Sequence, residues 1–405
     1  MFKNRNMIIL FFSMIVVMIG FGIIIPILPF YVESFGASSK ALGLLMSIFS
    51  IMQFIFAPIW GNLSDRYGRK SILLIGVFGN ALSQLLMGLS NQLWMLYASR
   101  ALAGILSSAT LPTAYAYISD TTDEKSRGSG MGVIGAATGV GMVLGPGIGG
   151  WLGAIDLSYP FYFAALLSTI AMVVAFIVLP ESLPVEKRVS SSKIELINLK
   201  VLLEALKGPL SFLMFLAFMI SFALTNFESI FGLYAEQRFG YGISQVGTIM
   251  TMVGLVSALI QGVATGPATR RWGESNVIKA SLIGSAVGFV LMVLAGNFTA
   301  VLFSVGAFIL ANSMLRPSIA SLISRNVKGS QGVAQGLNNS FMSLGRIIGP
   351  LWAGFLLDVK VTLPYLSGAV IFLLTFIASL IWLRFPRNVQ AEQETESGAV
   401  PVSMD

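Results

Sequence analysis

The chain has 405 residues, of which 55% are hydrophobic and 11% are charged, and its formal net charge is +7. This composition, with a mean hydropathy of +0.82, excludes a soluble globular domain and a disordered chain, and it indicates a protein that crosses a membrane many times. The sequence has no cysteine and no histidine, which excludes a disulfide framework and the usual near-neutral proton carrier.

Twelve apolar segments of about spanning length follow one another, separated by short polar breaks. The first is longer than the apolar core of a signal peptide and has no small-residue cleavage site after it, so we expect it to be retained. The predicted spans are 7–32, 41–60, 71–90, 93–118, 129–155, 160–179, 209–235, 242–268, 275–295, 298–324, 331–356 and 363–385.

Lysine and arginine are distributed unevenly between the two ends of these spans. With a cytoplasmic N-terminus, nineteen of them lie on the inner side and only Lys40, Arg238 and Lys360 on the outer side. This imbalance predicts a multi-pass protein of the cell membrane with both termini in the cytoplasm. It also accounts for the positive charge, so we expect the lipid bilayer and no nucleic acid as a partner.

The two halves of the chain resemble each other at an offset of about 204 residues. Matching pairs include Gly36 with Gly240, Gly68 with Gly273, and Gly145-Pro146 with Gly349-Pro350. Each copy contains six spans, and because six is even, both copies begin on the same side of the membrane and have parallel topology. Repeats of this kind place a substrate site between them near the bilayer midplane.

The sequence therefore predicts an all-α membrane protein with twelve transmembrane helices in two pseudo-symmetric six-helix bundles. The bundles are expected at 1–179 and 209–387. A cytoplasmic linker with an amphipathic helix is expected at 180–208, and a disordered cytoplasmic tail at 388–405.

Several short motifs lie in or between the spans. They are Pro26-Ile-Leu-Pro29, the segment from Gly61 to Lys70, the set Leu96, Arg100 and Gly104, the glycine-rich run from Gly141 to Gly150, Asn226-Phe-Glu228-Ser, and Arg316-Pro317. Together they resemble the major facilitator superfamily over essentially the whole chain, and within it the drug:proton antiporters, including bacterial quinolone, multidrug and tetracycline efflux pumps. The resemblance implies the twelve-span fold and antiport.

The segment between spans 2 and 3 is expected to form a conformational latch. Its residues are Gly61, Asp65, Arg66, Gly68, Arg69 and Lys70. Glycines permit a tight turn and Asp65 suits a helix N-terminus, while the superfamily resemblance implies Asp120 as the partner of Arg69. Alternatively, these charges reflect topology alone. Arg270 and Arg325 replace the two acids in the second copy, so we expect that half to lack the same latch.

Three glycines in span 5, Gly141, Gly145 and Gly149, recur every four residues and predict close approach of another helix. Pro146 favours a bend, and Gly150 completes the run. Packing alone explains much of this pattern, whereas the resemblance implies an antiporter motif; both interpretations stay open.

Four charged residues lie well inside predicted spans, away from the span ends: Glu228, Arg100, Arg316 and Arg346. Each costs at least ~2.5–3.5 kcal/mol on insertion scales, so each is a functional candidate. Glu228 and Arg100 both lie roughly 10 Å below the outer surface, where we expect them to meet across the interface between halves.

We expect Glu228 to take up a proton from outside and release it inward while drug leaves, with Arg100 or Arg316 changing its proton affinity. A static Glu–Arg pair is the alternative. Quinolone-efflux relatives tend to carry a second acid just before the Arg-Pro pair that matches Arg316-Pro317, and this chain does not. Two alternatives stay open: a simpler proton stoichiometry with one acid, or a deeper position of Glu33 or Asp156 that lets it take part in proton transfer.

Polar and aromatic residues on the inner faces are expected to contact substrate. They are Gln53, Tyr115, Phe222, Asn226, Phe227, Gln261, Asn312, Asn338 and Phe341. Such a mixture suits adaptable binding, although phenylalanine is also common in helix packing. Arg346 is expected to bind an anionic substrate group or to brace its helix.

The predicted function is export of amphipathic drugs or other small molecules by alternating access, carried out by a monomer, with protons as the coupling ion and no cofactor or metal. The alternatives are proton symport of a sugar or metabolite, lipid flipping, and a receptor that does not transport. No Walker loop, metal cluster or nucleophile triad is evident, so we expect neither an enzyme nor an ATP-driven pump.

Overall fold

The computed structural model describes residues 5–188, 199–208, 210–327 and 331–383, and within them all regular structure is helical. Twelve helices in this part of the chain are long and apolar enough to cross a membrane, which confirms the predicted spans. The helix bounds are α1 Arg5–Ser34, α2 Ser39–Tyr67, α3 Arg69–Gly88, α4 Leu93–Leu106, η1 Ser107–Ala109, α5 Thr110–Thr121, α6 Glu124–Gly153, α7 Tyr159–Val178, η2 Val185–Lys187, α8 Leu199–Ala205, α9 Ser211–Phe239, α10 Ile243–Leu259, η3 Ile260–Ala264, α11 Thr265–Trp272, α12 Glu274–Leu294, α13 Phe298–Asn326, α14 Gln331–Val359 and α15 Leu363–Trp382.

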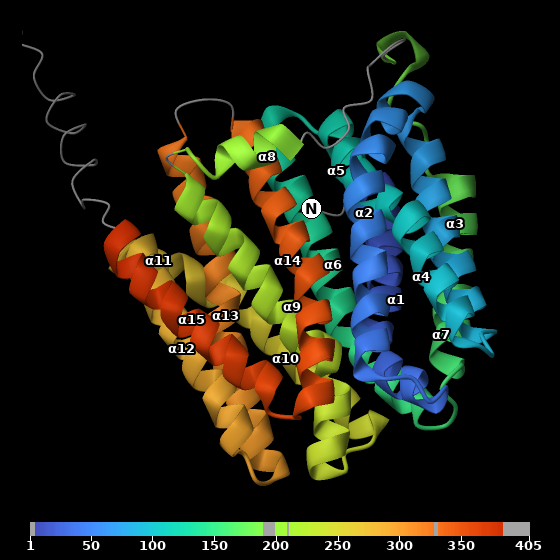
Figure 1. Cartoon of the computed structure of the whole chain (residues 1–405). Coiled ribbons are helices and arrows are strands. Elements are labelled where there is room, and N and C mark those ends of the chain that lie inside the picture. The colour runs from blue at the N-terminus through green and yellow to red at the C-terminus, as the bar shows by residue number, and fades with distance from the viewer. Residues whose placement is uncertain (1–4, 189–198, 209, 328–330, 384–405) are drawn as a thin grey trace, which may run out of the picture.

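The helices form two bundles, α1–α7 and α9–α15, which Figure 1 shows side by side. Span 4 consists of α4, η1 and α5, and span 8 of α10, η3 and α11. The short helix α8 belongs to the segment between the bundles; residues 189–198 of the expected amphipathic linker and the whole expected tail lie outside the described residues. We call the end of the molecule that carries α8 the linker end and the opposite end the far end.

The internal repeat is visible in the backbone. Among the described residues, positive φ angles occur at Gly36 and Gly240, with values of 68° and 69°, and at Gly68 and Gly273, with values of 100° and 77°. These are the two glycine pairs that the offset aligns. A left-handed backbone at both members of each pair shows that the copies share turn geometry as well as sequence.

The expected loop between spans 2 and 3 is far shorter than predicted. Helix α2 continues to Tyr67 and α3 begins at Arg69, so Gly68 alone separates the two helices. Its positive φ reverses the chain, and an added Cβ would collide with the Glu181 carboxylate. Because one residue makes the turn, Gly61 and Asp65 are helical and the prediction that they lie in a loop was wrong.

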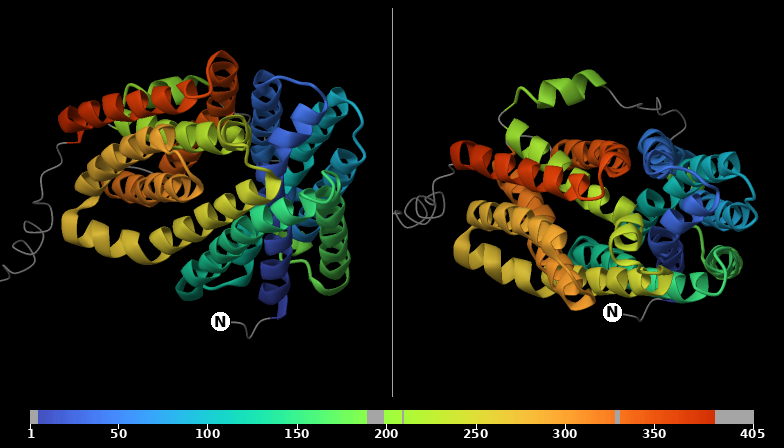
Figure 2. Two further views of the ribbon diagram at one scale, coloured as in Figure 1. Left: turned by 90° about the horizontal axis from the view of Figure 1, so that it is seen from below. Right: turned by 60° about the horizontal axis from the view of Figure 1, so that its bottom comes forward.

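The two bundles meet toward the far end. There α2 packs on α14, α6 on α10 and α1 on α9, and Figure 2 shows α10, in yellow, reaching α6 of the other bundle. A Cβ on Gly150 would lie 2.8 Å from the Cα of Gly247, and one on Gly232 would lie 2.8 Å from Pro29. Toward the linker end of α6, a Cβ on Gly132 or Gly135 would meet nothing within 4 Å.

Candidate functional site

Glu228 lies on α9 and is partly buried, while its neighbours Phe227 and Ser229 are 0% and 1% exposed. None of the described residues forms an ion pair or a hydrogen bond with its carboxyl group. A carboxylate within a membrane span is costly unless it is paired, hydrated or protonated. An unpaired carboxyl group is therefore suited to exchange a proton.

Arg100 does not meet Glu228, so this part of the prediction was wrong. The side chain is 4% exposed, and its guanidinium carbon lies 4.5 Å from the centre of the Phe49 ring, in the same bundle. Its Nη2 lies 3.6 Å from the Met46 sulfur, and Nε has no partner. Arg100 and Glu228 were expected to meet because they lie at equal depth in the membrane. Depth does not determine the side of the helix, and Arg100 lies on the side of α4 that points into the first bundle.

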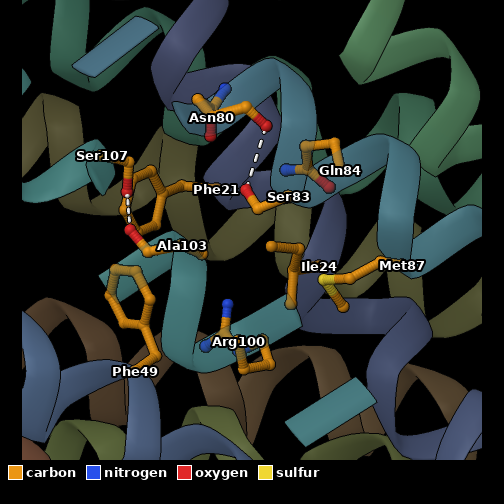
Figure 3. A pocket seen from close by; sticks show the side chains of 10 residues that line it. All are labelled: Phe21, Ile24, Phe49, Asn80, Ser83, Gln84, Met87, Arg100, Ala103 and Ser107. Atoms are coloured by element: carbon orange, nitrogen blue, oxygen red, sulfur yellow. Dashed lines mark hydrogen bonds between the residues drawn. The ribbon is translucent and has the colours of Figure 1, made fainter. Parts of the chain in front are cut away.

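Arg100 lines a cavity within the first bundle. Figure 3 shows its side chain beside Ile24 of α1 and Met87 of α3, with the polar residues Asn80, Ser83 and Gln84 of α3 across the cavity. The cavity volume is about 10 Å³. Substrate pockets have volumes of about 300–1,000 Å³, so this cavity is too small to hold a drug.

Arg316 on α13 is exposed, and Arg346 on α14 is partly buried. The Arg346 Nη2 donates to the Ser343 hydroxyl at 2.8 Å, and the two arginines are close enough for their charges to repel. Neither forms an ion pair with an acid in the residues that the structure describes. A static Glu–Arg pair is therefore absent from this conformation, as far as the described residues extend.

Arg69 contacts Asp120, as the resemblance implied, and also Asp65, which was expected at a helix N-terminus instead. Arg69 is 8% exposed. Its Nη1 lies 2.6 Å from Oδ1 of Asp65, and its Nε lies 2.9 Å from Oδ2 of Asp120. Nη1 also donates to the Ser64 hydroxyl at 2.6 Å. All four residues belong to the first bundle, so this cluster joins α2, α3 and α5 and does not join the bundles.

Glu181, which the sequence did not single out, completes this cluster. Its Oε1 accepts a hydrogen bond from the backbone N–H of Arg69 at 2.8 Å, and Oε2 accepts one from that of Lys70 at 3.3 Å. The carboxylate thus caps the N-terminus of α3 and complements the helix dipole. Glu181 is 112 residues from Arg69, and no spacing rule joins an acid after span 6 to the start of span 3.

The second bundle contains the same ion pair with its charges exchanged. Glu274 stands 205 residues after Arg69, and Arg325 stands 205 residues after Asp120. The Arg325 Nη2 lies 3.1 Å from the Glu274 Oε1, which also accepts a hydrogen bond from the Ser321 hydroxyl at 3.0 Å. The expectation that the second half lacks the latch is corrected: Arg325 has a partner because the position equivalent to Arg69 became acidic.

Replacing Asp120 by asparagine is expected to lower the stability of the first bundle. Arg69 is buried and would lose one of its two carboxylate partners, at a cost of about 1.5 kcal/mol. Thermal unfolding of the purified protein in detergent will measure this loss. Glu124→Gln, an exposed acid close by in the chain, should unfold like the parent, and equal stability of all three proteins would contradict the assigned contact.

The glycines of span 5 serve two separate contacts. Gly141, Gly145 and Gly149 face α1 within the first bundle, where a Cβ on Gly145 would lie 2.7 Å from the Cα of Gly22. Gly150 instead faces Gly247 on α10 of the second bundle, and the Pro146 carbonyl lies against the same glycine. The run therefore combines packing inside one bundle with contact between bundles.

Two of the expected substrate contacts lie in the core of the second bundle, which contradicts their prediction. Asn226 is 0% exposed and donates through Nδ2 to the Pro364 carbonyl at 3.2 Å. Phe227 is fully buried, with ring centroids 5.3 Å from Phe308 and 6.4 Å from Tyr365. Both hold α9 against its own bundle and have no face open to a ligand.

The other expected contacts differ in exposure. Gln53, Tyr115 and Arg346 are partly buried, and Gln261 is exposed. The remaining four are 3–5% exposed: Phe222, Asn312, Asn338 and Phe341. Of these, Asn312 Nδ2 and Asn338 Oδ1 are buried polar atoms without a hydrogen-bond partner. All eight stay predictions as substrate contacts.

Comparison with known proteins agrees with the fold and the motifs. The model of the Major Facilitator Superfamily matches residues 10–261 and again 213–404. Multidrug resistance protein 2 of Bacillus subtilis (strain 168) is 32% identical over 379 residues, which cover 93% of this chain and 94% of that protein. Quinolone resistance protein NorA of Staphylococcus aureus (strain MRSA252) is 29% identical, with 92% and 96% covered.

Solved structures share the same architecture. The crystal structure of the nucleoside transporter NupG matches with a TM-score of 0.80 at 15% identity, and the match covers 95% of this chain and all of that one. At this identity the likeness extends to the fold alone. Together with the family model and the relatives, it shows that the chain belongs to the major facilitator superfamily.

Proposed function

We propose that this protein exports amphipathic drugs from the cytoplasm in exchange for protons. Its similarity to a multidrug resistance protein and to a quinolone resistance protein, over more than nine-tenths of the chain, supports drug export. The observation that carries proton coupling is Glu228, the only acid that the sequence places within a span, whose carboxyl group has no partner among the described residues.

The arrangement of the bundles fits alternating access. They are in contact toward the far end, which we assign to the outside of the plasma membrane, and both termini then lie in the cytoplasm. In this conformation Glu228 gives its proton to the cytoplasm and drug enters between the bundles. Opening of the far end then releases the drug and returns a proton to Glu228. One chain holds both bundles, so a monomer is sufficient.

The intramembrane arginines differ as candidates for changing the proton affinity of Glu228. Arg316 is in the same bundle as Glu228 and is the better candidate for changing its proton affinity, since Arg100 faces the interior of the other bundle. Arg346 and Arg316 together present two cations without an acid among the described residues, which favours substrates that carry an acidic group as well as an apolar body.

Transport into proteoliposomes tests the function directly. With the cytoplasmic face of the protein outward and the lumen made acidic, a fluoroquinolone, which carries a carboxylate, should accumulate in the lumen more strongly than an ethidium-like cation. Collapsing the pH gradient should stop this accumulation. Movement of a fluorescent lipid without either drug would instead indicate a flippase. Loss of a preloaded sugar from the acidic lumen, together with protons, would indicate a symporter.

A further inference from the structure

The first turn of α2 is capped by a residue from the other bundle. Asp358, near the far end of α14, accepts a hydrogen bond from the backbone N–H of Ser39, the first residue of α2, at 3.0 Å. The preceding residue, Ser38, makes no side-chain capping bond. The first N–H groups of a helix have no partner within the helix, and a carboxylate there also complements the helix dipole.

The equivalent helix of the second bundle is capped differently. At the start of α10, the Gln245 side chain accepts a hydrogen bond from the backbone N–H of Gly242 at 2.8 Å. Both residues of that cap belong to the start of the same helix, so it is kept when the bundles separate. The cap on α2 requires α14 to be in place, which makes the repeat asymmetric at the far end.

A second contact of Asp358 is weaker. Its Oδ2 lies 3.8 Å from Nζ of Lys40, whose side chain is 56% exposed and also lies over the Phe355 ring. Exposed ion pairs of this kind contribute little to stability. The hydrogen bond to the helix terminus is therefore the contact through which Asp358 acts.

The cap can exist only while the far end is closed. Around it the backbones touch: a Cβ on Gly354 would collide with the Ser39 carbonyl, and one on Gly43 would collide with the Pro350 carbonyl. Deeper along the same interface, the Ser47 hydroxyl donates to the Ile347 carbonyl at 2.7 Å. Separation of α2 from α14 would break all of these contacts together and leave the first N–H of α2 without its carboxylate.

We propose that Asp358 is a positioning residue that holds the far end closed by capping α2 across the interface between the bundles. The proposal rests on the alternating access that the proposed function requires. Each opening of the far end breaks the cap and each closure restores it. Asp358 thereby sets the ratio of far-end-open to far-end-closed molecules without contacting a proton carrier or a drug.

The test measures opening itself. The chain has no cysteine, so a single Ser47→Cys substitution supplies one thiol at a site that is 0% exposed in the closed far end. A membrane-impermeant maleimide, added from outside without drug or pH gradient, will label this thiol only when α2 and α14 separate. In this background Asp358→Ala should raise the labelling rate about fivefold, as loss of an N-cap worth about 1 kcal/mol predicts.

Three further variants make the result specific. Asp358→Asn keeps an oxygen acceptor and should label at a rate between the parent and Asp358→Ala. Lys40→Gln should label like the parent. Asn297→Ala removes a comparable cap, which accepts from the Ala300 N–H at 2.8 Å at the same end but inside one bundle, and it too should label like the parent.

Two outcomes would overturn the proposal: unchanged labelling in Asp358→Ala, or an equal increase in Asn297→Ala, which would indicate general loosening. Failure of the proposed function is separable, because labelling requires neither drug nor protons. A protein that exports no drug can still show the Asp358 effect, and an active exporter can lack it.

Discussion

Glu228→Gln will abolish drug accumulation driven by a pH gradient and will leave the yield of folded protein unchanged. Glutamine keeps the shape and polarity of the side chain but cannot bind and release a proton. It also removes an insertion cost of about 2.5 kcal/mol or more for a charged group, so no loss of folding is expected. Everted membrane vesicles that are given an acidic lumen and a fluorescent drug will measure the rate.

The control for this prediction is Glu236→Gln on the same helix, two turns nearer the far end. It should retain gradient-driven accumulation, which would separate Glu228 from acids on α9 in general. Exchange of labelled drug down its own concentration gradient should survive in Glu228→Gln, since it needs no proton. Full proton-driven accumulation by Glu228→Gln would refute the assigned role.

Gly145→Val is expected to prevent the first bundle from folding. Even a Cβ at this position would lie 2.7 Å from the Cα of Gly22 and 2.8 Å from the Ile19 carbonyl, and these are backbone atoms that cannot rotate away. Overpacking typically costs about 1–3 kcal/mol, and occasionally more, and the rigid backbone atoms here place this site at the upper end. The amount of monodisperse protein after detergent extraction will show the effect.

Gly139→Val is the matched control, because it lies on the same helix and a Cβ there would meet nothing within 4 Å. The change in intrinsic helix propensity is the same at both positions, so it cancels in the comparison. Gly139→Val should yield as much protein as the parent. Similar losses in both variants would mean that α6 tolerates no side chain for reasons other than its contact with α1.

The sequence was sufficient for the fold because the signals for it are long and repeated. Twelve apolar runs of spanning length and an offset of about 204 residues do not depend on any single residue. The turn at Gly68 was less predictable, because sequence alone did not show that one residue with positive φ replaces a loop of several. Errors of this kind move the end of a helix without changing the topology.

The site was harder to predict because function depends on which face of a helix a residue occupies. Successive residues of an α-helix are about 100° apart, so Asn226 and Phe227 lie in the core although they directly precede Glu228. The position of Arg100 in its span predicts its depth in the membrane but not the side of α4 on which it lies. Its expected contact with Glu228 is therefore absent, and the side chain lies over Phe49 instead. The acids that accept from the backbone N–H groups of Ser39 and Arg69 also escaped prediction, since Asp358 and Glu181 are remote in sequence from these residues.

The exchanged signs of the two ion pairs, Arg69 with Asp120 and Glu274 with Arg325, have a consequence for symmetry. A pseudo-two-fold axis turns each bundle onto the other, so an unaltered duplicate would carry like charges at every pair of matching positions. Wherever such positions approach the axis, like charges repel and oppose closure of the linker end. In this chain the signs are reversed in the second copy, so the acid of the first pair occupies the position equivalent to the cation of the second pair. Residues that approach each other across the axis then carry opposite charges and attract.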